Sequence, residues 1–216
     1  MNMKKFLSNL LSVVLGIAIT FVVQAIIDRS QTKKDIRAAL ELVRTELGTN
    51  IDDIGVMTDY LNQERAAARY FIDHRHTLDS CPADSVSHHS GILFADASIS
   101  ISSDALELLK NSSLFPKIGD QSLSMKIIRA YDTSQSIAAV LNQHVIDRDN
   151  HFEATINEKT AALYASGGFI SIRDYIKTDY GYYALSRITS LAGIEAYADI
   201  TDIEDAIAAI SAYLKD

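Results

Sequence analysis

The sequence predicts an all-α protein: an N-terminal transmembrane helix followed by an antiparallel helical bundle built on two long helices. Three observations predict this class. An uncharged apolar run stands near the N-terminus, two later segments keep a helical period for about 40 residues each, and the 216-residue chain contains only two prolines. Because proline interrupts helices, its scarcity favours long ones.

The apolar run covers residues 6–27 and contains no charged side chain. A helix rises about 1.5 Å per residue, so the run would span about 33 Å, enough to cross the hydrocarbon core of a bilayer. We therefore predict a membrane anchor over residues 1–30 and a helical bundle domain over residues 31–216. The residues expected to anchor it are Phe6, Leu10, Leu15, Ile19, Val23 and Ile27.

A cleaved signal peptide is the alternative interpretation of the same run. Lys4 and Lys5 would form its basic start, and residues 23–25 would form its cleavage site. Two features favour the anchor. The run is longer than the apolar part of a signal peptide, which has about 7–15 residues. The chain after the run continues with a helical pattern, whereas cleavage needs an extended segment.

Charge is divided unevenly along the chain. Residues 1–37 contain six basic and two acidic side chains, a net charge of +4, and since the whole chain carries −8, residues 38–216 carry −12. An acidic domain repels phosphate backbones, so we expect no nucleic-acid partner. The basic side chains just after the apolar run are expected to contact lipid headgroups. They are Arg29, Lys33, Lys34 and Arg37.

The first long helix is predicted from about Thr32 to Ile72, leaving the membrane directly. Its apolar residues recur every three or four positions, which marks one buried stripe. They are Ile36, Leu40, Val43, Leu47, Ile51 and Ile54. Residues 74–103 break the period and are rich in serine, aspartate and histidine, so we predict a polar connector there.

Further helices are predicted after the connector. One begins at Asp104, with Glu107 completing a capping box. The second long helix begins near Gln121 and stops at the glycine pair of residues 167–168. A helix over residues 179–198 and a final helix follow, the last with a capping box formed by Thr201 and Glu204. The similar lengths of the two long helices suggest that they pair antiparallel.

Metal-ligand chemistry is concentrated in the connector. Its imidazoles and its thiol are good ligands for zinc or copper, but their spacing fits no tetrahedral pattern, and we interpret them as part of a solvated loop, with a metal site as the alternative. They are His74, His76, Cys81, His88 and His89. On the second long helix, His144, Asp147 and His151 share one face, which we interpret as a solvated face in preference to a metal site. We expect no cofactor.

Tyrosines gather in residues 164–183, where their apolar bodies and polar tips suit a protein interface. The candidate interface residues are Tyr175, Tyr180, Tyr182 and Tyr183. Signatures of catalysis are missing from the sequence: it has no phosphate-binding loop, no nucleophile elbow and no paired-histidine zinc motif. We therefore predict no catalytic residues and no enzymatic activity.

Residues 16–24, residues 36–47, residues 104–112 and residues 127–131 combine an anchor, a charged linker and heptad-like helices. Together they resemble an uncharacterised family of small single-pass bacterial membrane proteins with an N-terminal anchor and a helical soluble domain. The resemblance covers about half of the chain, and Ser113 stands where the family usually has glycine. It implies a single span in the bacterial inner membrane and no assigned activity.

The orientation rules disagree. Counting the basic residues that flank the run places the domain in the cytosol, whereas a short N-terminal tail favours export, which we prefer. We expect a membrane-anchored helical scaffold, partner-binding or sensory subunit whose partners are the lipid bilayer and another protein or a second copy of itself. The alternative is an extracytoplasmic sensor domain that binds a small ligand or a metal between its helices.

Overall fold

The computed structural model describes residues 3–165, 172–190 and 197–215, with the side chains of Phe21, Gln24 and residues 28–152, 173–190 and 197–215. Every regular element in these residues is a helix, which confirms the all-α class. The helices are α1 (Met3–Asp73), α2 (Ala83–Leu93), α3 (Asp104–Asn111), α4 (Gln121–Ala165), α5 (Ile172–Lys177), α6 (Asp179–Ser190) and α7 (Thr201–Lys215), with short 3-10 turns η1 (Leu78–Ser80) and η2 (Phe115–Lys117).

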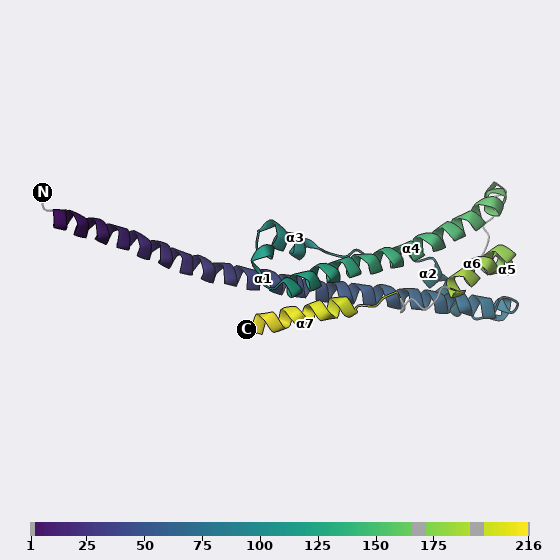
Figure 1. The fold of residues 1–216 in the computed structure, drawn as a ribbon. Helices are drawn as coiled ribbons and strands as arrows, with labels where there is room; N and C mark the ends of the chain where they lie inside the picture. The colour runs from purple at the N-terminus through teal and green to yellow at the C-terminus, as the bar shows by residue number, and fades with distance from the viewer. Residues whose placement is uncertain (1–2, 166–171, 191–196, 216) are drawn as a thin grey trace.

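The helices form an elongated body around α1 (Figure 1). α1 has 71 residues, which corresponds to about 107 Å, and its N-terminal part projects from the body as an extension. α4 lies along α1, α7 packs against both, and α5 and α6 lie at the end of the body farthest from the extension. The C-terminal end of α7 returns to the end nearest the extension, where Arg37 donates a hydrogen bond to the carbonyl of Leu214.

The predicted antiparallel pairing of the two long helices is wrong, because α1 and α4 run parallel. Tyr131 near the start of α4 bonds to Glu46, and Arg148, farther along α4, bonds to Glu64, so both helices advance in the same direction. The reason is the length of the connection. Residues 74–120 turn at the far end and return along the whole body before α4 begins. α7 is the antiparallel member of the bundle.

The predicted apolar stripes are confirmed as the core. On α1, Ile36, Leu40, Val43, Leu47 and Ile54 are buried and Ile51 is half-buried. The matching stripe of α4 consists of Ile127, Tyr131, Ser134, Ala138, Leu141, Val145, Arg148 and Phe152. α7 closes this part of the core with Ile203, Ala206 and Ile210. A second apolar cluster fills the far end, between α1, α2, α4, α5 and α6.

The predicted polar connector contains a helix that the sequence pattern did not indicate. α2 begins directly after Pro82, and Val86 and Leu93, two turns apart on one face, are buried against the rest of the body. Serine and histidine fill its other faces, so the segment looked like a loop. After α2 the chain is extended, and Asn142 of α4 holds Ile99 by two hydrogen bonds to its backbone, of 3.0 and 2.8 Å.

Neither predicted capping box forms. The N-terminal end of α3 is capped from another helix: Glu46 of α1 accepts hydrogen bonds from the N–H of Ala105, at 3.1 and 3.2 Å from its two carboxylate oxygens. At α7, Asp199 accepts hydrogen bonds from both the N–H and the hydroxyl of Thr201. Carboxylates still stabilise both helix starts, as the helix dipole favours, but they come from outside the predicted boxes.

Within the described part of the chain, none of the helices is both long enough and apolar enough to cross a membrane. The anchor predicted over residues 6–27 lies within the backbone of α1. Of its side chains, only those of Phe21 and Gln24 belong to the described residues. The predicted anchor side chains therefore lie outside the part that the structure describes; they are those of Phe6, Leu10, Leu15, Ile19, Val23 and Ile27.

Candidate functional site

A buried ion pair between α1 and α4 is the centre of the candidate site. Glu64 is fully buried and Arg148 is 4% exposed, and Nη1 of Arg148 donates a hydrogen bond of 2.6 Å to Oε1 of Glu64. Both residues occupy positions of the core stripes, since each follows a buried apolar residue, Leu61 or Val145, by three positions. Burying charge is costly unless it is paired and hydrogen-bonded, so this pair needs the partners that surround it.

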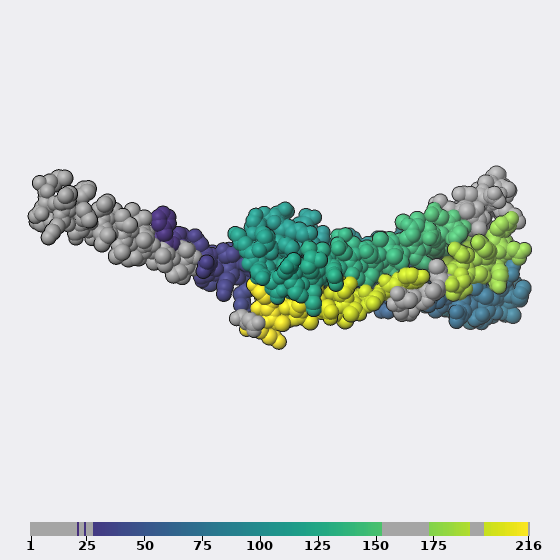
Figure 2. All heavy atoms as spheres, in the orientation of Figure 1, coloured from purple at the N-terminus to yellow at the C-terminus, as the bar shows by residue number. Residues whose placement is uncertain are grey.

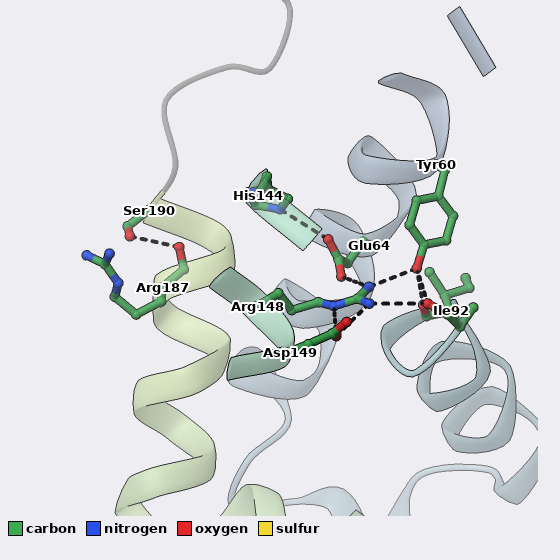
Figure 3. Close-up of polar contacts among 9 residues, drawn as sticks. Tyr60, Glu64, Ile92, His144, Arg148, Asp149, Arg187 and Ser190 are labelled. Atoms are coloured by element: carbon green, nitrogen blue, oxygen red, sulfur yellow. Dashed lines mark hydrogen bonds and ion pairs between the residues drawn. The ribbon is translucent and has the colours of Figure 1, made fainter. Parts of the chain in front are cut away.

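Four further groups complete the network (Figure 3). The second carboxylate oxygen of Glu64 lies 3.3 Å from Nε2 of His144. Arg148 also donates to the hydroxyl of Tyr60 at 3.0 Å, to the carboxylate of Asp149 at 2.8 Å and to the carbonyl of Ala95 at 3.3 Å. The network therefore joins α1 and α4 to the end of the α2 segment.

The electrostatics of the network favour the charged form of the Arg148 guanidinium. Burial opposes the charged form of Arg148, but the hydrogen bonds and charges of Glu64 and Asp149 outweigh it and raise the pKa of the guanidinium. Burial, together with the charge of Glu64, also raises the pKa of the Tyr60 hydroxyl. The tyrosine therefore stays neutral and serves as a hydrogen-bonding bridge.

A small cleft opens beside the ion pair, between α4 and α6, with about 390 Å³ of empty space counting its mouth. Its walls combine basic, acidic and apolar side chains, so it could take a small ligand with both polar and apolar parts. They are His144, Asp147, Arg148, His151, Phe152, Ala184, Arg187 and Ile188.

The structure brings together the three α4 residues that the sequence placed on one face. His144, Asp147 and His151 all line this cleft, although we had interpreted them as a solvated face. His144 contacts the buried Glu64, and the ring of His151 lies edge-on to that of Tyr183, 6.2 Å away. Among the described residues, no group of three or more His, Cys, Asp or Glu side chains has an arrangement that could hold a metal ion.

The connector histidines gather only in part. The rings of His74 and His89 both pack against the ring of Tyr70, with centroids 4.5 and 4.1 Å from it, and the ring of His88 lies 5.2 Å from that of His89. His76 is exposed. His89 is half-buried and stacked, so it is not the solvated loop residue that we expected. Burial and the neighbouring imidazoles lower its pKa.

The connector cysteine is also half-buried, and Sγ of Cys81 lies 3.7 Å from the carbonyl of Thr77. The nearby turn is closed by ion pairs to the far-end helices. Lys177 donates to Asp79 at 2.6 Å, and Arg75 to Asp179 at 2.9 Å. The segment is therefore held by tertiary contacts.

The four candidate interface tyrosines separate into two groups. Tyr175 is 6% exposed and belongs to the far-end core, so the structure does not present it to a partner. The other three lie on α6 with exposed fractions of 42–55%; they are Tyr180, Tyr182 and Tyr183. The predicted headgroup residues Arg29, Lys33, Lys34 and Arg37 are exposed along α1.

Sequence reasoning missed Glu64 as a partner of Arg148. The available signal was a charged residue at a core position of each long helix, but nothing in the sequence links two positions 84 residues apart. Comparisons with known proteins add no further assignment. No protein-family model matches the chain, and neither the curated proteins nor the solved structures include a significant match.

Proposed function

We propose that this protein is a non-catalytic, single-pass subunit of the bacterial inner membrane that presents a helical rod to a partner protein or to a second copy of itself. One observation carries the proposal. The helix that contains the uncharged run of residues 6–27 continues without a break through the core stripe as far as Asp73. Any movement of the anchor would therefore be passed directly to the body, as a scaffold or sensory subunit requires.

The fully buried Glu64 and the half-buried Glu46 support a structural role. Glu46 is used to cap α3, and Glu64 is used to pair with Arg148. Their hydrogen-bonding capacity is directed at this chain's own groups, so we assign neither of them to catalysis.

Anchoring is tested by alkaline extraction of membranes that contain the full chain. The wild type should remain in the pellet, and the double variant Leu15→Arg with Ile19→Arg should be released, because each arginine at mid-membrane costs about 2.5–3.5 kcal/mol on insertion scales. Val56→Arg is the matched control, since Val56 is an exposed apolar residue of the same helix. A mature chain that begins near Ile26 would instead favour a cleaved signal peptide.

The side of the membrane is tested by a reporter fused to the C-terminus. The short basic tail ahead of the run leads us to place the domain outside the cytosol. Activity of a fused alkaline phosphatase, which needs export to fold, would support this orientation. If the phosphatase fusion is inactive and a reporter that fluoresces only in the cytosol is bright when fused to the same end, the domain lies in the cytosol instead.

The exposed tyrosines of α6 are the proposed contact surface for a partner or a second copy. Tyrosine is enriched at interfaces because its rigid body buries much apolar area. The homo-oligomeric form of the proposal predicts that Tyr180→Ser with Tyr183→Ser shifts the detergent-solubilised chain to a smaller species in sedimentation velocity. Tyr197→Ser is the control, since Tyr197 is exposed to a similar extent but lies just before α7. If the wild-type chain is already a monomer, the homo-oligomeric form of the proposal is wrong and only a different partner protein remains.

The cleft beside the ion pair favours a second candidate function, a sensor domain that binds a small ligand between its helices, and a metal is tested as the alternative ligand. This candidate predicts that zinc, copper or a small amphipathic ligand raises the melting temperature of the full chain. The increase should disappear in His151→Gln, which changes the cleft and leaves Glu64 and Arg148 in place. No stabilisation across such a set of ligands would remove the sensor candidate.

A further inference from the structure

An acid-free segment lies at one end of an otherwise acidic body. Residues 108–119 contain Lys110 and Lys117 and no acidic side chain, although residues 38–216 together carry a net charge of −12. The segment covers the end of α3, the turn η2 and the approach to α4. Exposed acidic residues, Glu107 and Asp120, flank the segment directly, so its net charge of +2 is confined to these twelve residues, where it suits a negatively charged partner.

This segment also exposes apolar groups. Leu108 is 53% exposed and Pro116 lies at the surface, while Met125, in the first turns of α4, is 46% exposed. Pro116 and Met125 line an open groove of about 660 Å³, counting its mouth, and Asp120 stands at its side. The exposure does not come from a loosely attached loop, because Leu109 and Ile118 of the same segment are buried.

The segment lies at the end of the body nearest the N-terminal extension. Figure 1 shows the connection from α3 to α4 beside the point where α1 leaves the body, and in Figure 2 the same region forms the shoulder of the body above the C-terminal part of α7. Its position is fixed by a hydrogen bond of 3.1 Å from the hydroxyl of Tyr213 to the carbonyl of Ile118.

The spacing along α1 places this shoulder close to a bilayer. Among the described side chains of α1, Ile36 is the first buried one, nine residues after the end of the uncharged run at Ile27, which corresponds to about 14 Å of helix. The headgroup layer fills about 5–8 Å of that distance. The remainder is close to the Debye length of about 8 Å at physiological salt, and a helix tilt of about 20° would reduce it further.

We propose that residues 108–119 and Met125, here called the membrane-proximal surface, dock onto the anionic phospholipid headgroups of the membrane that anchors the chain. When the rod tilts toward the bilayer, Lys110 and Lys117 contact the phosphates, and the exposed apolar side chains reach the headgroup boundary. This second contact fixes the tilt of the helical body relative to the membrane. The anchor alone would leave that tilt unconstrained. The inference rests on the proposed anchoring.

The test uses the full chain with Cys81→Ser, so that one fluorophore can be attached to a single introduced cysteine. Ser112→Cys reports on the membrane-proximal surface, Ser87→Cys on an exposed position of α2, and Phe21→Cys on the anchor. Each labelled chain is reconstituted in phosphatidylcholine vesicles, with or without phosphatidylglycerol, that contain lipids with a nitroxide quencher. We expect quenching at position 21 in all vesicles and at position 112 only with phosphatidylglycerol, with none at position 87.

Lys110→Glu with Lys117→Glu should abolish quenching at position 112 and leave that at position 21 unchanged. Quenching at 21 with none at 112 would overturn this inference and leave anchoring intact. Absence of quenching at 21 would overturn the anchoring and this inference with it. Quenching at 112 that is equal without phosphatidylglycerol or in the lysine variant would overturn the assignment to anionic headgroups.

Discussion

Asn50 of α1 and Ser102 hydrogen-bond to each other twice, as residues of neighbouring β-strands do. The Asn50 amide nitrogen donates to the carbonyl of Ser102 at 3.0 Å, and its oxygen accepts from the N–H of Ser102 at 3.2 Å. Asn142 holds Ile99 from α4 in the same way. A strand-like segment is thus satisfied by side chains of two helices, without a sheet.

Removing one of these amides should loosen the extended segment. Asn50 is fully buried, so Asn50→Leu leaves the backbone groups of Ser102 without partners and should cost about 1–3 kcal/mol of the free energy of unfolding. Gln143→Leu is the control, because Gln143 is exposed and bonds only to Asp147 on its own helix. Chemical denaturation in detergent measures both. Equal stability of the two variants would contradict the role of Asn50.

The ion pair of Glu64 and Arg148 gives the second prediction. Glu64→Gln leaves a buried guanidinium without its main counter-charge and should destabilise the chain by about 3–5 kcal/mol. Asp149→Asn removes a partner whose side chain is 53% exposed and should cost about 0–1 kcal/mol. The double variant Glu64→Leu with Arg148→Met should recover most of the loss, since it removes both charges. Thermal unfolding compares the four proteins.

The third prediction concerns pH and Glu46. Burial alone would raise its pKa, but hydrogen bonds from Ser102, Tyr131 and the N–H of Ala105 outweigh this and hold the pKa below the ordinary value of 4.5. A depressed pKa stabilises the fold above the ordinary value, and this contribution is lost as the pH falls through the folded-state pKa. The difference in unfolding free energy between the wild type and Glu46→Gln should therefore shrink in acid. A difference that grows in acid would contradict it.

Ser113 gives the fourth prediction. Its φ of 58° lies in the left-handed region, which favours glycine. Ser113→Gly should raise the unfolding free energy by up to about 1 kcal/mol. The neighbouring Ser112 has a helical φ of −73°, so Ser112→Gly should lower stability by about 0.5–1 kcal/mol. Two shifts of the same sign would contradict the backbone argument.

Gly181 gives the fifth prediction. A Cβ at this position would overlap with the carbonyl oxygen of Tyr175 and lie 2.9 Å from its carbonyl carbon, so Gly181→Ala would push α6 away from α5. We expect a loss of about 1–3 kcal/mol, typical of overpacking. Gly55→Ala is the control: no atom lies within 4 Å of its Cβ position in α1, and it should stabilise by about 0.4–1 kcal/mol. The melting temperature should fall in Gly181→Ala and rise in Gly55→Ala, and an unchanged melting temperature in Gly181→Ala would contradict the prediction.

The helices that the sequence predicted correctly are those whose burial depends on local periodicity. Ile36 to Ile54 in α1 and Ile127 to Phe152 in α4 repeat every three or four residues, so the pattern identified which face is buried. Periodicity carries no information about direction. The parallel arrangement of α1 and α4 follows from a long return connection, and it could not be inferred from either stripe.

The features that the sequence did not predict share one physical cause: each depends on residues that are distant in the sequence. Val86 and Leu93 form a buried face only because α1 lies opposite them, and Glu64 is tolerable in the core only because Arg148 reaches it. In the same way, the cap of α3 comes from Glu46, 59 positions earlier. The cleft depends on how α4 and α6 approach each other, so the sequence identified three of its residues on one helix face but not the cleft itself.

The parallel pairing of α1 and α4 has a consequence for how the chain folds. Its defining contacts join residues 84 and 85 positions apart, and the contact of Arg37 with Leu214 spans 177 positions. A bundle of successive hairpins would form through contacts close in sequence, whereas this topology has a high contact order, which slows folding. During synthesis, the apolar stripe of α1 would therefore wait uncovered until α4 emerges, and a chaperone is best placed to protect it in that interval.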